Sequence, residues 1–328
     1  MTSTVHSPQR SKRQVRWSVA KRVAGLAFVA IVVVLIWRSL SGIDWNEVWG
    51  ALKSYRFVTL LPAIGLACLS FTLHASFDLL GRRYTGHHLS AWRTMLIAWL
   101  AYVFNLNVGA MIGGIGMRLR LYTRSGVSAS QVAGVYTIAV VTNWTGYMIL
   151  AGLMFVWQPP VLPKSWGISP WLLQVIGAGM LVSGAAYLVA CATLRQRSIK
   201  VRGRRFRLPT FRFAVMQTVL SIVNWVTLGT LINLLLPPQV TVPAALTALL
   251  VGAVAGALAH IPAGIGVLES VFVVMLGHVV PESTVVAALI CYRALYYLLP
   301  MVIATAVYGC MELRGARRDR PDAIGSNP

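Results

Sequence analysis

Two short glycine motifs interrupt long apolar stretches of this chain. Residues 113–118 read GGIGMR and residues 262–269 read PAGIGVLE, so each motif has a charged residue just beyond its glycines. Glycine and proline break helices, and at membrane depth irregular backbone persists only where protein or a water-filled cavity surrounds it. Paired interruptions in the two halves of a membrane protein are typical of a substrate site near the middle of the bilayer. We therefore expect the two motifs to mark such a site.

The composition of the chain is that of a polytopic membrane protein. Of its 328 residues, 57% are hydrophobic and only 11% are charged, which is too apolar for a soluble domain. The formal net charge of +21 would suit a nucleic-acid-binding protein, but the basic residues lie between apolar runs and form no basic folded module. We therefore expect no nucleic-acid partner. The four cysteines have no metal-ligand spacing, and we expect no metal and no cofactor.

Six apolar runs are long enough to cross the roughly 30 Å hydrocarbon core of a bilayer as helices. They cover about 22–40, 57–80, 128–156, 169–193, 213–236 and 284–311. The first run follows a basic arm at residues 1–21 and has no small-residue cleavage site after it, so we expect an uncleaved anchor. Two further apolar stretches, 94–116 and 243–278, contain the glycine motifs.

The distribution of basic residues indicates how these two stretches are arranged, because basic loops stay in the cytoplasm. If both stretches are re-entrant hairpins, five basic segments share the cytoplasmic side and hold 24 of the 29 basic residues. These segments are 1–22, 81–93, 117–127, 194–212 and 312–328. If only the first stretch crossed fully, the eight basic residues of the loop 194–212 would lie outside. We therefore predict two hairpins and cytoplasmic termini.

This arrangement makes the two halves of the chain inverted copies of each other. The first hairpin enters from the cytoplasm within a repeat at about 57–156, and the second enters from the outside within a repeat at about 213–311. We predict an all-α polytopic membrane protein with six full transmembrane helices and two re-entrant helical hairpins arranged as inverted repeats. Its single integral membrane domain would cover 22–312, followed by a basic cytoplasmic tail at 313–328.

Charged side chains within membrane segments usually face a cavity or a partner, since inserting one costs about 2.5–3.5 kcal/mol. Arg118 and Arg120 follow the first motif, Glu269 follows the second, and Arg293 lies deep in the last apolar run. One interpretation is a structural pairing of the glutamate with arginine that holds the hairpins together. The other is a positive site for an anionic head group, with Glu269 as counter-charge or gate. The two interpretations are compatible.

Other polar residues give weaker signals. A helix that begins after either motif would present free N–H groups and a dipole that favour an anion. Asn143 and His260 could bond between helices or line a polar path, and His260 could relay protons. Asp78 is expected to pair with Arg82, four residues later. The predicted substrate-binding residues are Arg118, Arg120, Glu269, Arg293, Gly114, Gly116, Gly264, Gly266, Asn143 and His260.

Four stretches of the chain resemble a known membrane family, the lysylphosphatidylglycerol synthase transmembrane region family. They are residues 77–82 (FDLLGR), 113–122 (GGIGMRLRLY), 260–269 (HIPAGIGVLE) and 292–297 (YRALYY). The similarity covers roughly 16–312. It implies a flippase-like module, because in members with a soluble synthase domain a similar membrane region is thought to flip aminoacylated phosphatidylglycerol. This chain ends at Pro328, and we expect no synthase domain in it.

The sequence contains no Walker loop and no GxSxG, HExxH or CxxC motif, so we expect neither an enzyme nor an ATP-driven pump. We predict a bacterial inner-membrane protein that binds membrane phospholipids with an anionic or aminoacylated head group and moves them between leaflets. The alternatives are a proton-coupled secondary transporter of a small anion or amphiphile, and a non-transporting partner of a lipid-synthesising enzyme. A lateral opening to lipid favours the first function, a closed aqueous cavity the second, and a plugged midplane the third.

Overall fold

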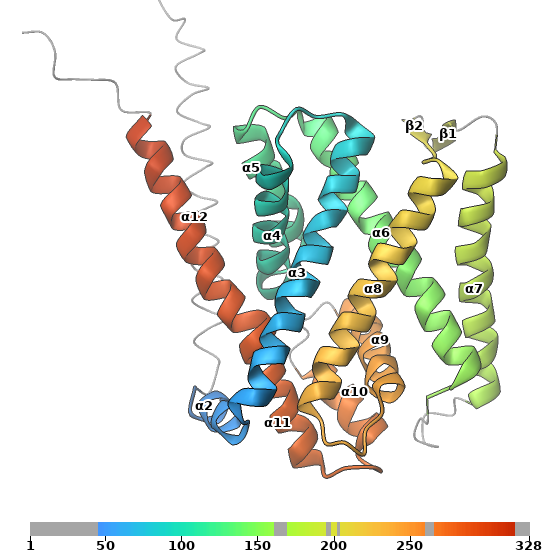
Figure 1. Ribbon diagram of the computed structural model, residues 1–328. Coiled ribbons are helices and arrows are strands. Elements are labelled where there is room, and N and C mark those ends of the chain that lie inside the picture. Colours follow the sequence, from blue (N-terminus) through green and yellow to red (C-terminus); the bar gives the residue numbers. More distant parts are fainter. Residues whose placement is uncertain (1–44, 161–168, 195–197, 202–203, 260–265, 319–328) are drawn as a thin grey trace, which may run out of the picture. The chain divides into compact units, whose positions relative to one another are not determined.

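The computed structural model describes residues 45–160, 169–194, 198–201, 204–259 and 266–318. In these ranges the chain is almost entirely helical (Figure 1). Its helices are α2 (Trp45–Ser54), α3 (Phe57–Thr85), α4 (Ala91–Val108), α5 (Met117–Arg124), α6 (Ala129–Trp157), α7 (Pro170–Thr193), α8 (Phe211–Leu235), α9 (Val242–Ala259), α10 (Val267–Leu276), α11 (Glu282–Arg293) and α12 (Leu299–Arg318). Two π-helical segments, η1 (Ala110–Gly116) and η4 (Ala294–Leu298), interrupt the α-helical pattern.

Within the described ranges, five helices have the length and apolar composition to cross a membrane. They are α3, α6, α7, α8 and the long helix Glu282–Arg314, in which α11, η4 and α12 follow one another without a break. These helices coincide with the last five of the six predicted spans. The first predicted span, 22–40, lies outside the described residues. The chain is therefore a multi-pass membrane protein.

Polar capping residues determine where several of these helices begin. The Ser90 hydroxyl accepts a hydrogen bond from the backbone of the third residue of α4, and Ser169 and Thr210 do the same for α7 and α8. At the start of α6, Ser128 and Gln131 form a reciprocal capping box. Each cap satisfies a backbone N–H that has no partner inside its helix. Local sequence therefore fixes the beginning of these spans.

The first glycine motif forms a turn within a helical hairpin. Helix α4 ends at Val108. The next residue, Gly109, has a φ of 102°, in a region that favours glycine, and the chain then reverses through η1 into α5. A Cβ atom on Gly113 would lie 2.2 Å from the carbonyl carbon and oxygen of Phe104, so only glycine allows η1 to approach α4 this closely. The sequence motif thus provides both the reversal and the close packing of the two arms.

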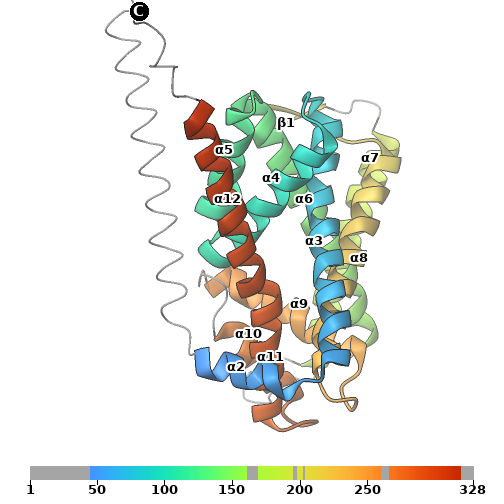
Figure 2. The same ribbon diagram turned by 60° about the vertical axis from the view of Figure 1, so that its left-hand side comes forward.

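The second glycine motif connects α9 to α10, which pack against each other as α4 packs against η1 and α5. Its residues 260–265 lie outside the described residues, whereas Gly266 begins α10 with a φ of 81°. In two views, α4 and α5 lie beside one half of α3, while α9 and α10 lie at the other half of the bundle (Figure 1 and Figure 2). The two hairpins therefore occupy opposite ends of the same helical bundle.

The basic loop 194–212 contains a short β-hairpin that the sequence analysis did not predict. Strand β1 (Ser198–Val201) pairs antiparallel with β2 (Arg204–Arg207), with Ser198 opposite Arg207. The all-α prediction is correct for the membrane bundle and misses this hairpin. This β-hairpin lies at the same end of the bundle as the loop after α3 and the end of α12 (Figure 1).

Candidate functional site

A buried ion pair joins α3 to the helix that follows the first glycine motif. Arg118 Nε lies 3.0 Å from Asp78 Oδ2, and Arg118 Nη2 lies 3.0 Å from Asp78 Oδ1. Tyr122 donates its hydroxyl to Asp78 Oδ2 at 3.0 Å, and Arg118 Nη1 donates to the carbonyl of Gly114 at 3.2 Å. Asp78 is 0% exposed and Arg118 is 3% exposed. Such a two-pronged, buried pair compensates both charges and holds its two helices in one arrangement.

The expected pairing of Asp78 with Arg82 is wrong. Asp78 lies on the interior face of α3, and the guanidinium of Arg118 reaches it from α5. Arg82 follows Asp78 by one turn on the same helix, but the bidentate geometry is made by the arginine across the interface. The interior orientation of Asp78 explains why a partner from another element replaces the local one.

His87, in the loop after α3, packs beside this ion pair. The centroid of its ring lies 5.5 Å from that of Tyr122, and the residue is 4% exposed. Burial lowers the pKa of His87, and the nearby guanidinium of Arg82 lowers it further. Burial and Arg82 thus favour the neutral form of His87 beside the Asp78–Arg118 pair.

A second ion pair joins the start of α10 to the last residue of α11. Arg293 donates through Nε to Glu269 Oε1, and through Nη2 to Glu269 Oε2 at 3.0 Å. Glu269 Oε2 also accepts the backbone N–H of Gly266 at 2.9 Å, which caps α10. The guanidinium of Arg293 lies 5.4 Å from the centroid of the Tyr297 ring. The predicted structural pairing of Glu269 with an arginine is thus observed, and Arg293 is that arginine.

Arg120 binds a third carboxylate. Its Nη2 lies 3.0 Å from Glu312 Oε1, while Arg124 Nη1 lies 2.8 Å from Glu312 Oε2. The three arginines that were predicted to form one positive site are therefore bound by three different carboxylates: Asp78, Glu269 and Glu312. Their binding of an anionic head group remains a prediction.

A buried chain of hydroxyl groups connects four elements of the bundle. The hydroxyl of Tyr102 on α4 lies 3.3 Å from that of Tyr296 in η4, which lies 2.9 Å from Ser70 Oγ on α3. Ser70 in turn donates to Asn224 Oδ1 on α8 at 2.8 Å. Because Ser70 has a single proton, it must accept from Tyr296, and Tyr296 must accept from Tyr102. The chain therefore has one direction, and it links α3 and α4 of the first half to α8 and η4 of the second.

The sequence analysis missed the residues of this hydroxyl chain. Tyrosines in an apolar run resemble core aromatics, and nothing local shows that Tyr102 and Tyr296 meet. The available signal was the dense run of tyrosines that follows Arg293, at Tyr296 and Tyr297. The π-helical turn η4 contains both tyrosines, and such turns are frequent at functional sites.

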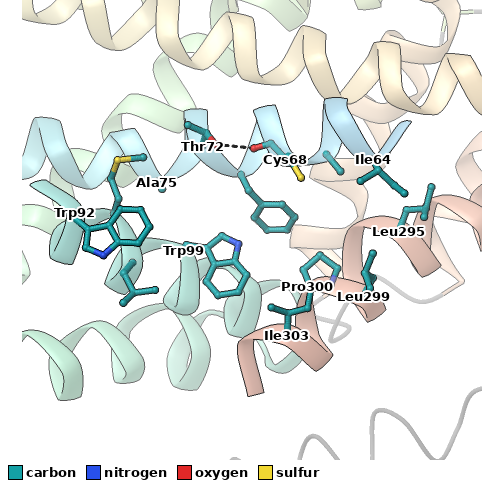
Figure 3. A pocket seen from close by; sticks show the side chains of 14 residues that line it. Ile64, Cys68, Thr72, Ala75, Trp92, Trp99, Leu295, Leu299, Pro300 and Ile303 are labelled. Atoms are coloured by element: carbon teal, nitrogen blue, oxygen red, sulfur yellow. Dashed lines mark hydrogen bonds between the residues drawn. The ribbon is translucent and has the colours of Figure 1, made fainter. Parts of the chain in front are cut away.

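An apolar groove of about 410 Å³ lies between α3, α4 and the last helix (Figure 3). Its lining includes Cys68 and Thr72 of α3, Trp99 of α4 and Ile303 of α12. The hydroxyl of Thr72 donates back to the carbonyl of Cys68 at 2.8 Å, so it offers the groove no unbonded donor. The groove opens to the side of the bundle, because Trp92 at its edge is 74% exposed and Ile303 is 47% exposed.

One aromatic ring separates this groove from the hydroxyl chain. Phe71 lines the groove, and its ring stacks on that of Tyr296 with the centroids 4.7 Å apart. On the other side, the ring of Phe71 meets Tyr102 edge-on at 5.7 Å. The apolar groove and the buried polar chain are therefore adjacent.

A family model described as the lysylphosphatidylglycerol synthase TM region matches residues 23–304. The chain belongs to this family. It is 40% identical to the inner membrane protein YbhN of Escherichia coli over 303 residues, covering 92% of this chain and 95% of the relative. It is 27% identical to the uncharacterized protein slr0712 of Synechocystis, over 94% of this chain and 98% of that one. The family predicted from the motifs is confirmed.

A more distant relative in this family comparison is the phosphatidylglycerol lysyltransferase of Staphylococcus aureus, which is 20% identical over 297 residues. The match covers 88% of this chain but only 34% of the relative. The chain therefore corresponds to about a third of that longer protein. What the remaining two thirds do says nothing about this chain.

The remaining predicted site residues lie in several different elements of the structure. Gly114 and Gly116 lie in η1, and Gly266 precedes α10. Asn143 of α6 contributes its main-chain carbonyl, which accepts the hydroxyl of Ser221 at 3.0 Å. Gly264 and His260 lie outside the described residues. None of these positions tests whether the residue touches a substrate.

Replacing Glu269 by Gln is expected to lower the free energy of unfolding by about 1–3 kcal/mol, since Arg293 loses a charged partner at a largely buried position. Gln retains an acceptor for the Gly266 N–H, so α10 should keep its cap. The measurement is thermal unfolding in detergent. The control is Glu282→Gln, at an exposed carboxylate in the first turn of α11. Equal unfolding midpoints for the two variants would contradict the pairing.

Proposed function

We propose that this protein binds a membrane phospholipid, with an acyl chain in the lateral groove and the head group near the buried polar residues, and moves it between leaflets. The observation that carries this proposal is the contact of Phe71 with Tyr296, which places an apolar groove directly beside a polar interior. A phospholipid joins an apolar chain to a polar group in the same way. The two environments therefore match the two parts of one molecule.

The shape and lining of the groove support a lipid over a water-soluble substrate. The groove opens sideways among exposed apolar side chains such as Trp92 and Ile303, which face hydrocarbon when the bundle spans a bilayer. A small anion would lose its hydration among these mainly apolar walls, which carry no charged side chain to compensate it. A lateral opening is the feature that favours phospholipid movement over a closed aqueous pathway.

The interior supports an anionic head group. Arg293 is bound to Glu269, and the two side chains are 15% and 20% exposed, respectively. A phosphate could therefore replace the carboxylate without entering a fully buried site. The Staphylococcus aureus relative is described as a phosphatidylglycerol lysyltransferase, which points to phosphatidylglycerol or its aminoacylated form as the class of lipid. Arg118, in contrast, is bound in a buried pair and serves to hold α5 against α3.

The arrangement of the hairpins supports alternating access through inverted repeats. In each half, the helix after a glycine motif is tied to a long helix by a bidentate ion pair. In the first pair the hairpin carries the arginine, Arg118, whereas in the second it carries the carboxylate, Glu269. We propose that both hairpins are re-entrant, and that rocking of one half against the other moves the head group between them.

The topology that accompanies this function is a proposal as well. The loops after α3, α5 and α7 lie at one end of the bundle (Figure 1). Arg82 and Arg83 lie in the last turn of α3, Arg124 ends α5, and the loop 194–212 holds eight basic residues. We therefore assign this end to the cytoplasm and the bundle to the inner membrane. Residues 22–40 would supply a sixth span, and both termini would be cytoplasmic.

A substitution that fills the groove tests this function. Replacing Cys68 by Trp is expected to slow transbilayer movement of labelled phosphatidylglycerol about tenfold in reconstituted vesicles, which is equivalent to about 1.4 kcal/mol. Cys68 lines the groove and is exposed within it (Figure 3). The matched control is Leu69→Trp, since Leu69 is the next residue of α3, is 46% exposed and does not line the groove.

The same assay separates the alternatives. Movement that is equal in both folded variants would overturn the role of the groove. Retention of lipid without any movement would indicate a non-transporting lipid-binding partner of a lipid-synthesising enzyme, a role that also suits the hydroxyl chain that fills the interior between the halves. Movement that requires a pH gradient would indicate a proton-coupled transporter.

A further inference from the structure

Glu312, near the end of the last helix, is held by two arginines of α5. Arg120 donates to Glu312 Oε1 through Nε at 3.3 Å and through Nη2 at 3.0 Å. Arg124, one turn further along the same helix, donates to Oε2 through Nη1 at 2.8 Å. Two guanidinium groups therefore converge on one carboxylate. The carboxylate of Glu312 is therefore shared between two positive charges.

The cluster also contains a buried hydroxyl group. The hydroxyl of Tyr308 lies beside Arg120 and Glu312, one turn before Glu312 on α12. It is buried, with the residue 5% exposed, and among the described residues it makes no hydrogen bond of ordinary geometry. A ligand with more acceptor oxygens than a carboxylate would offer this hydroxyl a better-aligned partner than Glu312 does.

We propose that Arg120, Arg124 and Tyr308 form a binding site for a phosphate group, and that Glu312 occupies this site when the phosphate is absent. A phosphate has more acceptor oxygens and more negative charge than a carboxylate, so it matches the two guanidinium groups and adds an acceptor for the Tyr308 hydroxyl. The side chains of Arg120, Glu312 and Arg124 are 21%, 26% and 42% exposed, which leaves the site open to exchange.

The location of the site favours a lipid phosphate over a free one. Helix α5 and the end of α12 lie at the end of the bundle where the basic loops gather (Figure 1). Clusters of basic side chains near a membrane surface attract anionic lipids. The site is separate from the groove, whose lining includes none of its residues. Phosphate binding here would release α12 from α5 and thereby free the first hairpin.

The release of α12 would regulate the movement that we propose above, and that part rests on the proposed function. The binding itself does not. If the protein binds phosphate at this cluster but moves no lipid, the proposed binding site is correct and only its regulatory role is refuted. Retention of lipid and transbilayer movement are therefore measured separately.

The decisive variant is Tyr308→Phe, assayed on the full chain in phosphatidylcholine nanodiscs that contain phosphatidylglycerol. If Glu312 is only a structural partner, loss of the Tyr308 hydroxyl leaves the retention of phosphatidylglycerol unchanged. If phosphate binds, retention of phosphatidylglycerol, measured by mass spectrometry after purification, should fall about tenfold with an unchanged unfolding midpoint. Arg120→Gln with Arg124→Gln should abolish specific retention, and Glu312→Gln should raise it severalfold because the competing charge is lost.

The matched control replaces two exposed arginines at the same end of the bundle, Arg83→Gln with Arg93→Gln, and should leave retention unchanged. Added inorganic phosphate identifies the source of the ligand: displacement of the lipid shows that the site accepts any phosphate, and failure to displace it shows a preference for the lipid. The proposal is overturned if Tyr308→Phe has no effect on retention, or if the control lowers it as much as the Arg120 and Arg124 variant.

Discussion

Replacing Asp78 by Asn is expected to destabilise the protein by about 3–5 kcal/mol, enough to prevent most of it from folding. The substitution leaves the guanidinium of Arg118 charged in a site where both residues are at most 3% exposed. It also weakens the acceptor for the Tyr122 hydroxyl, which is bonded to Asp78 Oδ2. The measurement is the yield of monodisperse protein in detergent together with its unfolding midpoint.

A double variant distinguishes a structural pair from a substrate-binding one. Asp78→Leu with Arg118→Met removes both charges and fills similar volume, and such exchanges of a buried pair are often neutral or stabilising. We expect this variant to recover most of the stability that Asp78→Asn loses, and to retain anionic lipid as wild type does. Normal folding of Asp78→Asn alone would contradict the pairing seen in the structure. Loss of lipid retention in the folded double variant would indicate that Arg118 binds the head group.

Replacing Gly113 by Ala is expected to cost about 1–3 kcal/mol or more, because the added methyl group collides with backbone. Its carbon would lie 2.2 Å from the carbonyl of Phe104 and 2.3 Å from the backbone nitrogen of Asn105. Neither atom can move aside without displacing α4, so the hairpin itself must open. Unfolding in detergent and proteolysis between α4 and α5 both report this opening.

The matched control for this prediction is Gly65→Ala in the middle of α3. A Cβ at Gly65 meets no atom within 4 Å, and Gly65 is exposed, so alanine there should stabilise the helix by up to about 1 kcal/mol. The two substitutions add the same methyl group. If they shift the unfolding midpoint equally, the close contact between η1 and α4 has no part in stability.

Much of the helical framework could be predicted from the sequence because membrane spans depend on length and composition alone. The run predicted at 169–193 is observed as Pro170–Thr193, and the run at 128–156 as Ala129–Trp157. The β-hairpin at 198–207 was missed, since its basic residues were interpreted only as a topology signal. The π-helical segments were missed too, because one additional residue in a turn leaves no mark on hydropathy.

The contacts of the candidate site were harder to predict because they depend on how the hairpins fold back. Glu269 and Arg293 are 24 residues apart, and their pairing could be proposed from the scarcity of charge in that half. Asp78 and Arg118 are 40 residues apart and meet only after the chain reverses at Gly109. Glu312 was not singled out, because the two arginines of α5 that bind it lie 192 and 188 residues away in the sequence.

The unbroken helix from Glu282 to Arg314 gives the two hairpins a common mechanical connection. It carries the partner of α10, Arg293, and the partner of α5, Glu312, whose separation of 19 residues corresponds to about 28 Å along a helix axis. The segment η4 lies between them. Because one continuous helix holds both ion-pair partners, a rotation or shift of this helix at one hairpin would be transmitted along its axis to the ion pair of the other.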